Sequence, residues 1–83
     1  MKLLYFAWLR QKIGKAEEKL DPPAQVIDVR SLLDWLETQG ANYAAALKER
    51  RAVNVAVNQD YVGLDHPVKA GDEVALFPPV TGG

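Results

Sequence analysis

Residues 74–83, VALFPPVTGG, contain the residue types whose chemistry stands out in this sequence. The apolar run 74–77 is typical of a strand. Pro78 and Pro79 must end that strand, because proline lacks the backbone N–H that pairing in a sheet requires. The two prolines also keep the backbone extended, so they direct the following residues away from the body of the protein.

The tail that follows, residues 78–83, ends in Gly82 and Gly83. Glycine has no Cβ, so we expect a thin, flexible end that fits a narrow channel. A C-terminal carboxylate has a reference pKa of roughly 3.3–3.7, and as an anion it needs activation, for example by ATP to an acyl-adenylate. Most chain ends simply fray, but a rigid Pro-Pro spacer is expected where a terminus is presented to an enzyme. The Gly83 carboxylate is therefore the candidate reactive group.

The composition restricts the classes of function. The 83 residues suit one domain with a small core, over residues 1–77. A net charge of −1 predicts no basic face, which argues against nucleic-acid and anionic-membrane partners. The sequence has no cysteine, so disulfides and thiolate sites within it are excluded and a cytoplasmic location is permitted. The longest apolar run, residues 3–9, is too short to span a bilayer, and the polar residues 10–12 after it argue against a signal peptide.

No group of residues supports catalysis by the chain itself. The sequence shows no nucleophile paired with a base, no phosphate-binding glycine loop and no cluster of metal ligands. We interpret His66 as a loop residue, and Asp72 and Glu73 as turn residues before the last strand. We therefore expect no bound metal or cofactor. If the chain takes part in a reaction, another protein supplies the active site.

Apolar periodicity predicts an α+β fold. The first and last predicted strands are the most apolar, so we expect them to be central and parallel. This is the β-grasp arrangement, a mixed sheet of four to five strands with one main helix and a short second helix. The predicted strands cover residues 3–9, 17–20, 53–58, 61–62 and 74–77, and the predicted helices cover 28–40 and 42–51.

The main helix has a clear apolar stripe, formed by Val29, Leu32, Leu33 and Leu36. Asp28 is a suitable N-cap and Gly40 a suitable C′ residue. Trp35 lies off the stripe, and we expect it over the edge of the core. At the end of the short helix, the sequence gathers Lys48, Arg50 and Arg51. We interpret them as cations that stabilise a helix C-terminus, in preference to a docking patch.

The two central strands also predict an apolar face on the side away from the main helix. Alternation puts Val74 and Leu76 toward the core and Phe77 outward. Phe6 points the same way from the first strand, and Tyr61 borders both. An exposed apolar patch is usually an interaction site, so we predict that Phe6, Tyr61 and Phe77 form a partner interface at the root of the tail. The alternative is that Phe6 and Phe77 belong to the core.

Several stretches resemble the small, sulfur-carrier subunits of molybdopterin synthase, also called molybdopterin-converting factor subunit 1. They are 55–58 (VAVN), 71–74 (GDEV) and, most specific, 77–83 (FPPVTGG); residues 4–7 (LYFA) with Arg10 also fit. The resemblance covers the whole chain in length and order of elements.

The resemblance implies a ubiquitin-like fold and a cytoplasmic carrier. An E1-like enzyme that uses ATP would adenylate the Gly83 carboxylate, which would then become a thiocarboxylate. The tail, with Pro78, Pro79, Thr81 and Gly82, would enter the large subunit of a heterotetramer of two small and two large subunits. There it would give its sulfur to cyclic pyranopterin monophosphate. Catalytic groups would belong to that partner.

Two alternatives remain open. In the first alternative, the chain is a related ubiquitin-like sulfur carrier, for thiamine or for tRNA thiolation. The residues FPPVT before the glycines argue against the thiamine carriers. Otherwise it is a non-catalytic binding module with an inert Gly-Gly end.

Overall fold

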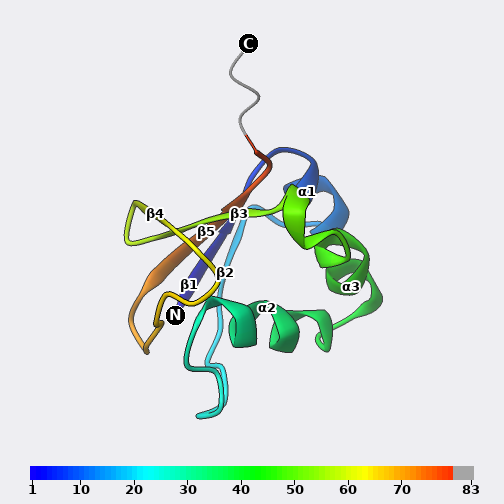
Figure 1. Ribbon diagram of the computed structural model, residues 1–83. Helices are drawn as coiled ribbons and strands as arrows, with labels where there is room; N and C mark the ends of the chain where they lie inside the picture. Colours follow the sequence, from blue (N-terminus) through cyan, green and yellow to red (C-terminus); the bar gives the residue numbers. More distant parts are fainter. Residues whose placement is uncertain (80–83) are drawn as a thin grey trace.

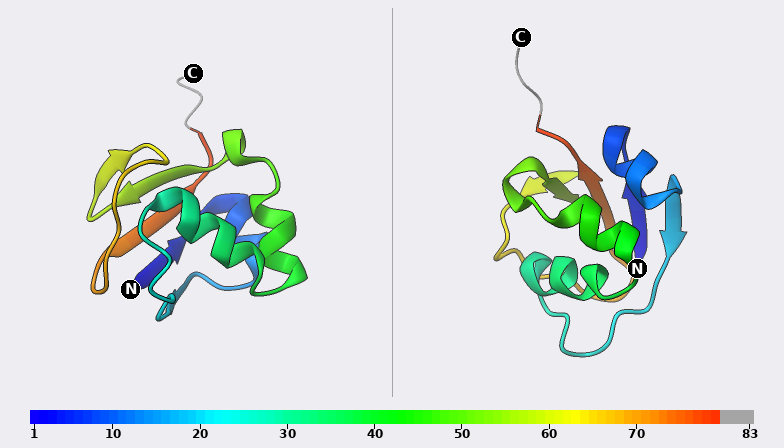
Figure 2. Two further views of the ribbon diagram at one scale, coloured as in Figure 1. Left: turned by 60° about the horizontal axis from the view of Figure 1, so that its bottom comes forward. Right: turned by 90° about the vertical axis from the view of Figure 1, so that its right-hand side faces the viewer.

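The computed structural model describes residues 1–79, in which helices cover one face of a five-stranded sheet (Figures 1 and 2). The strands are β1 (Lys2–Tyr5), β2 (Glu17–Lys19), β3 (Asn54–Val57), β4 (Asp60–Val62) and β5 (Glu73–Phe77). The helices are α1 (Ala7–Ile13), α2 (Val29–Glu37) and α3 (Ala41–Leu47), followed by a 3-10 turn, η1 (Arg50–Ala52).

The sheet has the strand order β2-β1-β5-β3-β4, so β5 is central. β1 and β5 are parallel, with Leu3 opposite Val74 and Tyr5 opposite Leu76, and the other neighbouring pairs are antiparallel. Parallel strands need a long crossover connection. Here the chain between β1 and β5 supplies α2 and α3, which pack over the sheet. The predicted α+β, ubiquitin-like β-grasp fold with its parallel central pair is confirmed.

Helix α2 follows the predicted apolar stripe closely. Its four stripe residues are fully buried, and Asp28 caps it by accepting a hydrogen bond from the Ser31 backbone N–H at 2.8 Å. Trp35 is partly buried against the core, as predicted. The prediction for Gly40 is wrong: the C-cap of α2 is Thr38, and Gly40 instead precedes the first turn of α3.

The prediction of one strand over residues 3–9 is wrong after Tyr5. Ala7 adopts a left-handed φ of 54°, and the chain turns into α1, which the sequence analysis missed. Leu9 and Ile13, four residues apart, bury one side of α1 in the core. A short apolar run does not separate a strand from a buried helix, and here the helix continues to Ile13.

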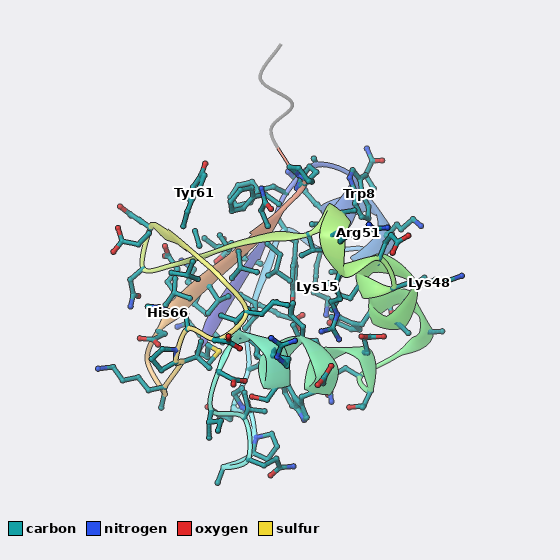
Figure 3. The ribbon with its side chains drawn as sticks, in the orientation of Figure 1. Trp8, Lys15, Lys48, Arg51, Tyr61 and His66 are labelled. Carbon is teal, nitrogen blue, oxygen red and sulfur yellow. The ribbon has the colours of Figure 1, made fainter. Side chains whose placement is uncertain are left out.

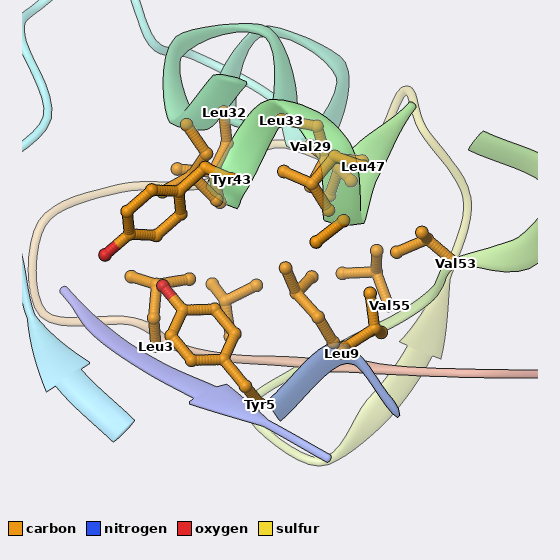
Figure 4. Close-up of a cluster of buried hydrophobic side chains, with 14 of the residues drawn as sticks. Leu3, Tyr5, Leu9, Val29, Leu32, Leu33, Tyr43, Leu47, Val53 and Val55 are labelled. Carbon is orange, nitrogen blue, oxygen red and sulfur yellow. The ribbon is translucent and has the colours of Figure 1, made fainter. Parts of the chain in front are cut away.

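The main core lies between the sheet and the helices. Figure 4 shows Leu3 and Tyr5 from β1 and Leu9 from α1 facing Leu32 of α2 and Leu47 of α3 across this layer. All five side chains are at most 1% exposed.

One charged group is tied to this core at the sheet edge. Glu18 of β2 accepts hydrogen bonds at 2.6 Å from the hydroxyls of Tyr5 and Tyr43, and Lys15 donates a third at 3.2 Å. Burial alone raises the pKa of Glu18, but the hydrogen bonds from Tyr43, Tyr5 and Lys15 outweigh burial and lower its pKa below the ordinary value. The carboxylate therefore joins the edge strand β2 to both β1 and α3.

Replacement of Leu36 by Ala should lower the free energy of unfolding by about 2–5 kcal/mol, since it leaves a cavity beneath α2. Denaturant unfolding measures this difference. Arg30→Ala on the exposed side of the same helix is the control; its ion pair is with the exposed Asp65, and its loss should cost at most about 1 kcal/mol. Equal stability of Leu36→Ala and wild type would contradict the assignment of the buried stripe.

Glu18→Gln should destabilise the fold in a pH-dependent way. The folded-state pKa of Glu18 is lowered, so its stabilising effect is complete above the unfolded-state pKa of about 4.3 and is lost as pH falls through the folded-state pKa. Urea melts of both proteins at pH 7 and at pH 3 measure this. The difference in unfolding free energy between wild type and Glu18→Gln should be large at pH 7 and smaller at pH 3. A difference that is the same at both pH values would contradict the role assigned to Glu18.

Candidate functional site

The root of the tail lies at the end of the central strand. β5 ends at Phe77, which pairs with Asn54 of β3, and Pro78 and Pro79 follow directly. Pro78 is partly buried and Pro79 exposed. Thr81, Gly82 and Gly83 lie outside the described residues.

Aromatic side chains gather at this root on the open side of the sheet. Phe6 is 48% exposed and Tyr61 74% exposed, and Phe77 is partly buried. The rings of Tyr61 and Phe77 contact each other, with centroids 5.1 Å apart and planes inclined by 46°. We call the patch formed by Leu4, Phe6, Tyr61, Ala75 and Phe77 the aromatic face; in the view of Figure 3, Tyr61 lies beside the root of the tail.

Strand register explains why these residues meet. Leu4 pairs with Ala75, Ala75 with Ala56, and Ala56 with Tyr61, which makes a continuous row across the four strands on the side opposite the helices. The backbone N–H of Phe6 donates to the Leu76 carbonyl at 3.1 Å, so Phe6 stays beside the end of β5 after β1 has ended. The structure thus brings the three predicted interface residues to one end of the sheet, and their role in binding stays a prediction.

A second polar feature lies at the opposite end of β5. Asp72 is buried, and its carboxylate accepts hydrogen bonds from Asn58 Nδ2 at 3.1 Å and from the Lys69 backbone N–H at 2.9 Å. Burial opposes ionisation of Asp72, but these bonds outweigh it and lower the pKa. Since the carboxylate holds the β3–β4 turn against the start of β5, its role is structural. The sequence pattern around Asp72 indicated only a turn, with no sign of this buried contact.

The pocket beside Asp72 holds no catalytic arrangement. It has a volume of about 260 Å³, and His66 and Lys69 line it. His66 lies in a loop, as predicted. Within residues 1–79 no three His, Asp or Glu side chains are placed to hold a metal ion. In that same part of the chain, no helix has the length and hydropathy needed to cross a membrane.

Comparison with known proteins identifies the family. Residues 3–83 match the model of the ThiS family. The chain belongs to this family. Among its relatives, a protein of Escherichia coli named molybdopterin synthase sulfur carrier subunit is 40% identical over 83 residues, which cover 100% of this chain and 99% of that protein.

Solved structures of similar proteins agree with this ThiS-family fold. A Pyrococcus furiosus protein described as a candidate molybdopterin converting factor, subunit 1, superposes with a TM-score of 0.76 at 35% identity, over 95% of each chain. SAMP1 from Haloferax volcanii superposes with a TM-score of 0.73 at 32% identity, over 100% of this chain and 98% of that one.

Proposed function

We propose that this chain is a sulfur carrier subunit of molybdopterin synthase. The observation that carries the proposal is its 40% identity, over the full chain, to the Escherichia coli protein of that name. The fold supports it, because the central strand leads through Pro78 and Pro79 toward the C-terminal glycines. We also propose that the carrier acts in the cytoplasm. Its chain has no cysteine, so it has no disulfide that the reducing cytoplasm could break.

In the proposed cycle, the Gly83 carboxylate attacks the α-phosphate of ATP in an E1-like activating enzyme, and pyrophosphate leaves. A donor of sulfur at the oxidation level of sulfide then attacks the acyl-adenylate carbonyl, AMP leaves, and a thiocarboxylate remains. In the catalytic large subunit, the thiocarboxylate sulfur attacks a carbon of cyclic pyranopterin monophosphate and displaces an oxygen leaving group. Water then hydrolyses the resulting thioester, which restores the carboxylate and leaves the sulfur on the pterin; two such transfers make the dithiolene. This chain binds no cofactor in the cycle; ATP belongs to the activating enzyme, and the acid–base groups belong to the large subunit.

The aromatic face is the proposed docking surface for both partners. Phe6, Tyr61 and Phe77 are exposed or partly buried at the root of the tail, so a protein that covers them also receives the tail. Aromatic residues commonly dominate the binding energy of an interface. If one surface serves the activating enzyme and the large subunit, the two complexes are mutually exclusive, and the carrier must leave one protein before it meets the other.

Phe77→Ala should weaken binding to the large subunit at least tenfold, which is about 1.4 kcal/mol. Titration calorimetry measures the affinity, and a denaturant melt measures stability. Ile27→Ala is the matched control, since Ile27 is also a large exposed apolar side chain (64%) but lies in the loop before α2. Unchanged affinity together with a large loss of stability would assign Phe77 to the core.

Addition of one residue after Gly83, or deletion of Gly83, should abolish sulfur transfer and leave the unfolding free energy unchanged. The measurements are dithiolene formation with the large subunit and intact mass after incubation with the activating enzyme, ATP and a sulfur donor. Only the unaltered terminus should exchange one oxygen for sulfur. A protein with one residue added at its N-terminus is the control. Full activity of the C-terminally extended protein would refute the reaction at Gly83, and absence of any adenylate from the unaltered protein would favour an inert binding module.

A further inference from the structure

Positive charge is concentrated in two segments of the chain. Residues 6–16 and 41–53 contain six of the ten Lys and Arg residues, but only Glu49 of the eleven Asp and Glu residues. The net charge of −1 predicted no basic face, and it conceals this separation. The remaining segments are correspondingly acidic.

The fold brings these two segments together. Helices α1 and α3 pack side by side, and Asn42 at the start of α3 donates a hydrogen bond to the Ile13 carbonyl at the end of α1, at 2.7 Å. Helix α1 begins directly after Phe6, so it starts at the root of the tail. The right-hand view of Figure 2 shows the two helices on one side of the molecule.

Two of the six cations are neutralised within the protein. Arg50 pairs with Asp34 at 2.7 Å and with Glu37, and Lys15 pairs with Glu18 at 3.2 Å. The other four are exposed, and no carboxylate of residues 1–79 lies within 4.0 Å of their charged groups. We call these four residues, Arg10, Lys12, Lys48 and Arg51, the cationic face. Arg10 and Lys12 are two residues apart, so they lie on different flanks of α1, on either side of its buried Leu9 and Ile13.

Helix stability explains this face only in part. Arg10 and Lys12 lie in the last turn of α1, and Lys48 is the C-cap of α3, where a cation interacts favourably with the helix dipole. Arg51, however, lies in the 3-10 turn beyond α3. Several like charges on neighbouring helices repel one another, and this repulsion opposes the small gain at each helix end. The docking patch that the sequence analysis ranked second therefore has new support, because α1 adds two cations that the sequence did not place there.

We propose that the cationic face binds an acidic surface of the catalytic subunit, next to the entrance that receives the tail. The proposal rests on the proposed function. The face is adjacent to the aromatic face, since Phe6 belongs to the aromatic face and α1 begins at the next residue. A partner that encloses the tail would touch both. Charges at the rim of an interface act mainly on the association rate, through long-range attraction that salt screens.

The test compares two double charge reversals with the same change in net charge. Lys12→Glu/Lys48→Glu alters the cationic face. Lys19→Glu/Lys69→Glu is the control; both residues are exposed and lie at the end of the sheet opposite the tail, where Lys19 pairs with Lys2, and Lys2 with the first residue of β5. Stopped-flow mixing with the purified large subunit measures association and dissociation rates at low salt and at 1 M salt.

The cationic-face variant should associate about tenfold more slowly at low salt, with little change in dissociation rate and with no difference at 1 M salt. The association rate of the control at low salt should fall clearly less than that of the cationic-face variant. Equal association rates of the two variants would overturn the proposal, even if the cationic-face variant melts earlier, because a helix-dipole role affects stability alone. A second outcome would also overturn the proposal. Wild type would bind single-stranded RNA in a salt-sensitive way, and the cationic-face variant would lose this binding while it still associates normally with the large subunit. The face would then be assigned to nucleic acid.

The outcome is separable from that for the proposed function. The reaction at Gly83 is judged by the exchange of oxygen for sulfur and by dithiolene formation at saturating protein, which the variant should still perform. If the cationic-face variant associates as fast as the control, and the wild-type protein also exchanges no oxygen for sulfur, both proposals are refuted. The association rate refutes the cationic face, and the intact mass refutes the reaction at Gly83.

Discussion

The parallel pairing of β1 with β5 is the constraint on which the rest of this structure depends. It joins the first and last strands of the chain, with Leu3 opposite Val74 and Tyr5 opposite Leu76. A parallel pair cannot be closed by a tight turn, so the intervening chain must cross over the sheet, and its helices form the second layer of the core. The same pairing fixes what surrounds the tail: β1 ends beside the end of β5, so Phe6 and α1 necessarily flank the residues that lead to Pro78.

The two sides of the sheet differ in burial, which separates the stability of the fold from the proposed recognition of partners. On the helical side, Leu3, Tyr5, Val74 and Leu76 are at most 1% exposed, and the carboxylate of Glu18 at the edge of this layer has three hydrogen-bond donors. On the open side, Phe6 and Tyr61 keep much of their surface in water. The domain therefore does not need its open face for a core, and that apolar surface remains available to a partner.

The order of apolar and polar residues predicted correctly those helices and strands whose own sequence shows which side is buried. The stripe on α2 and the alternation of β3 and β5 needed no knowledge of the rest of the chain. Helix α1 was missed because residues 3–9 are uniformly apolar, and the break depends on the backbone of Ala7 and on burial of Leu9 and Ile13 against other elements. Asp72 was missed because Asn58, the side chain that satisfies its carboxylate, is distant in sequence. The Gly-Gly end could be recognised from the sequence alone. The proximity of the charged residues of α1 and α3 could not, because these helices are brought together only by the tertiary fold.

This arrangement suits a carrier that must meet one protein and then another. A large apolar interface would bind tightly, but it would dissociate slowly, and affinity differences between related complexes arise mostly in the dissociation rate. A small aromatic face limits that effect, and a cationic face beside it raises the rate of encounter without extending the apolar contact. The long crossover between β1 and β5 makes both possible, because it places an open sheet face and a helical face on adjacent sides of the same tail. In the proposed cycle, fast exchange between partners would follow from where the fold puts its charges and its rings, and the chemistry would be left to the terminal carboxylate.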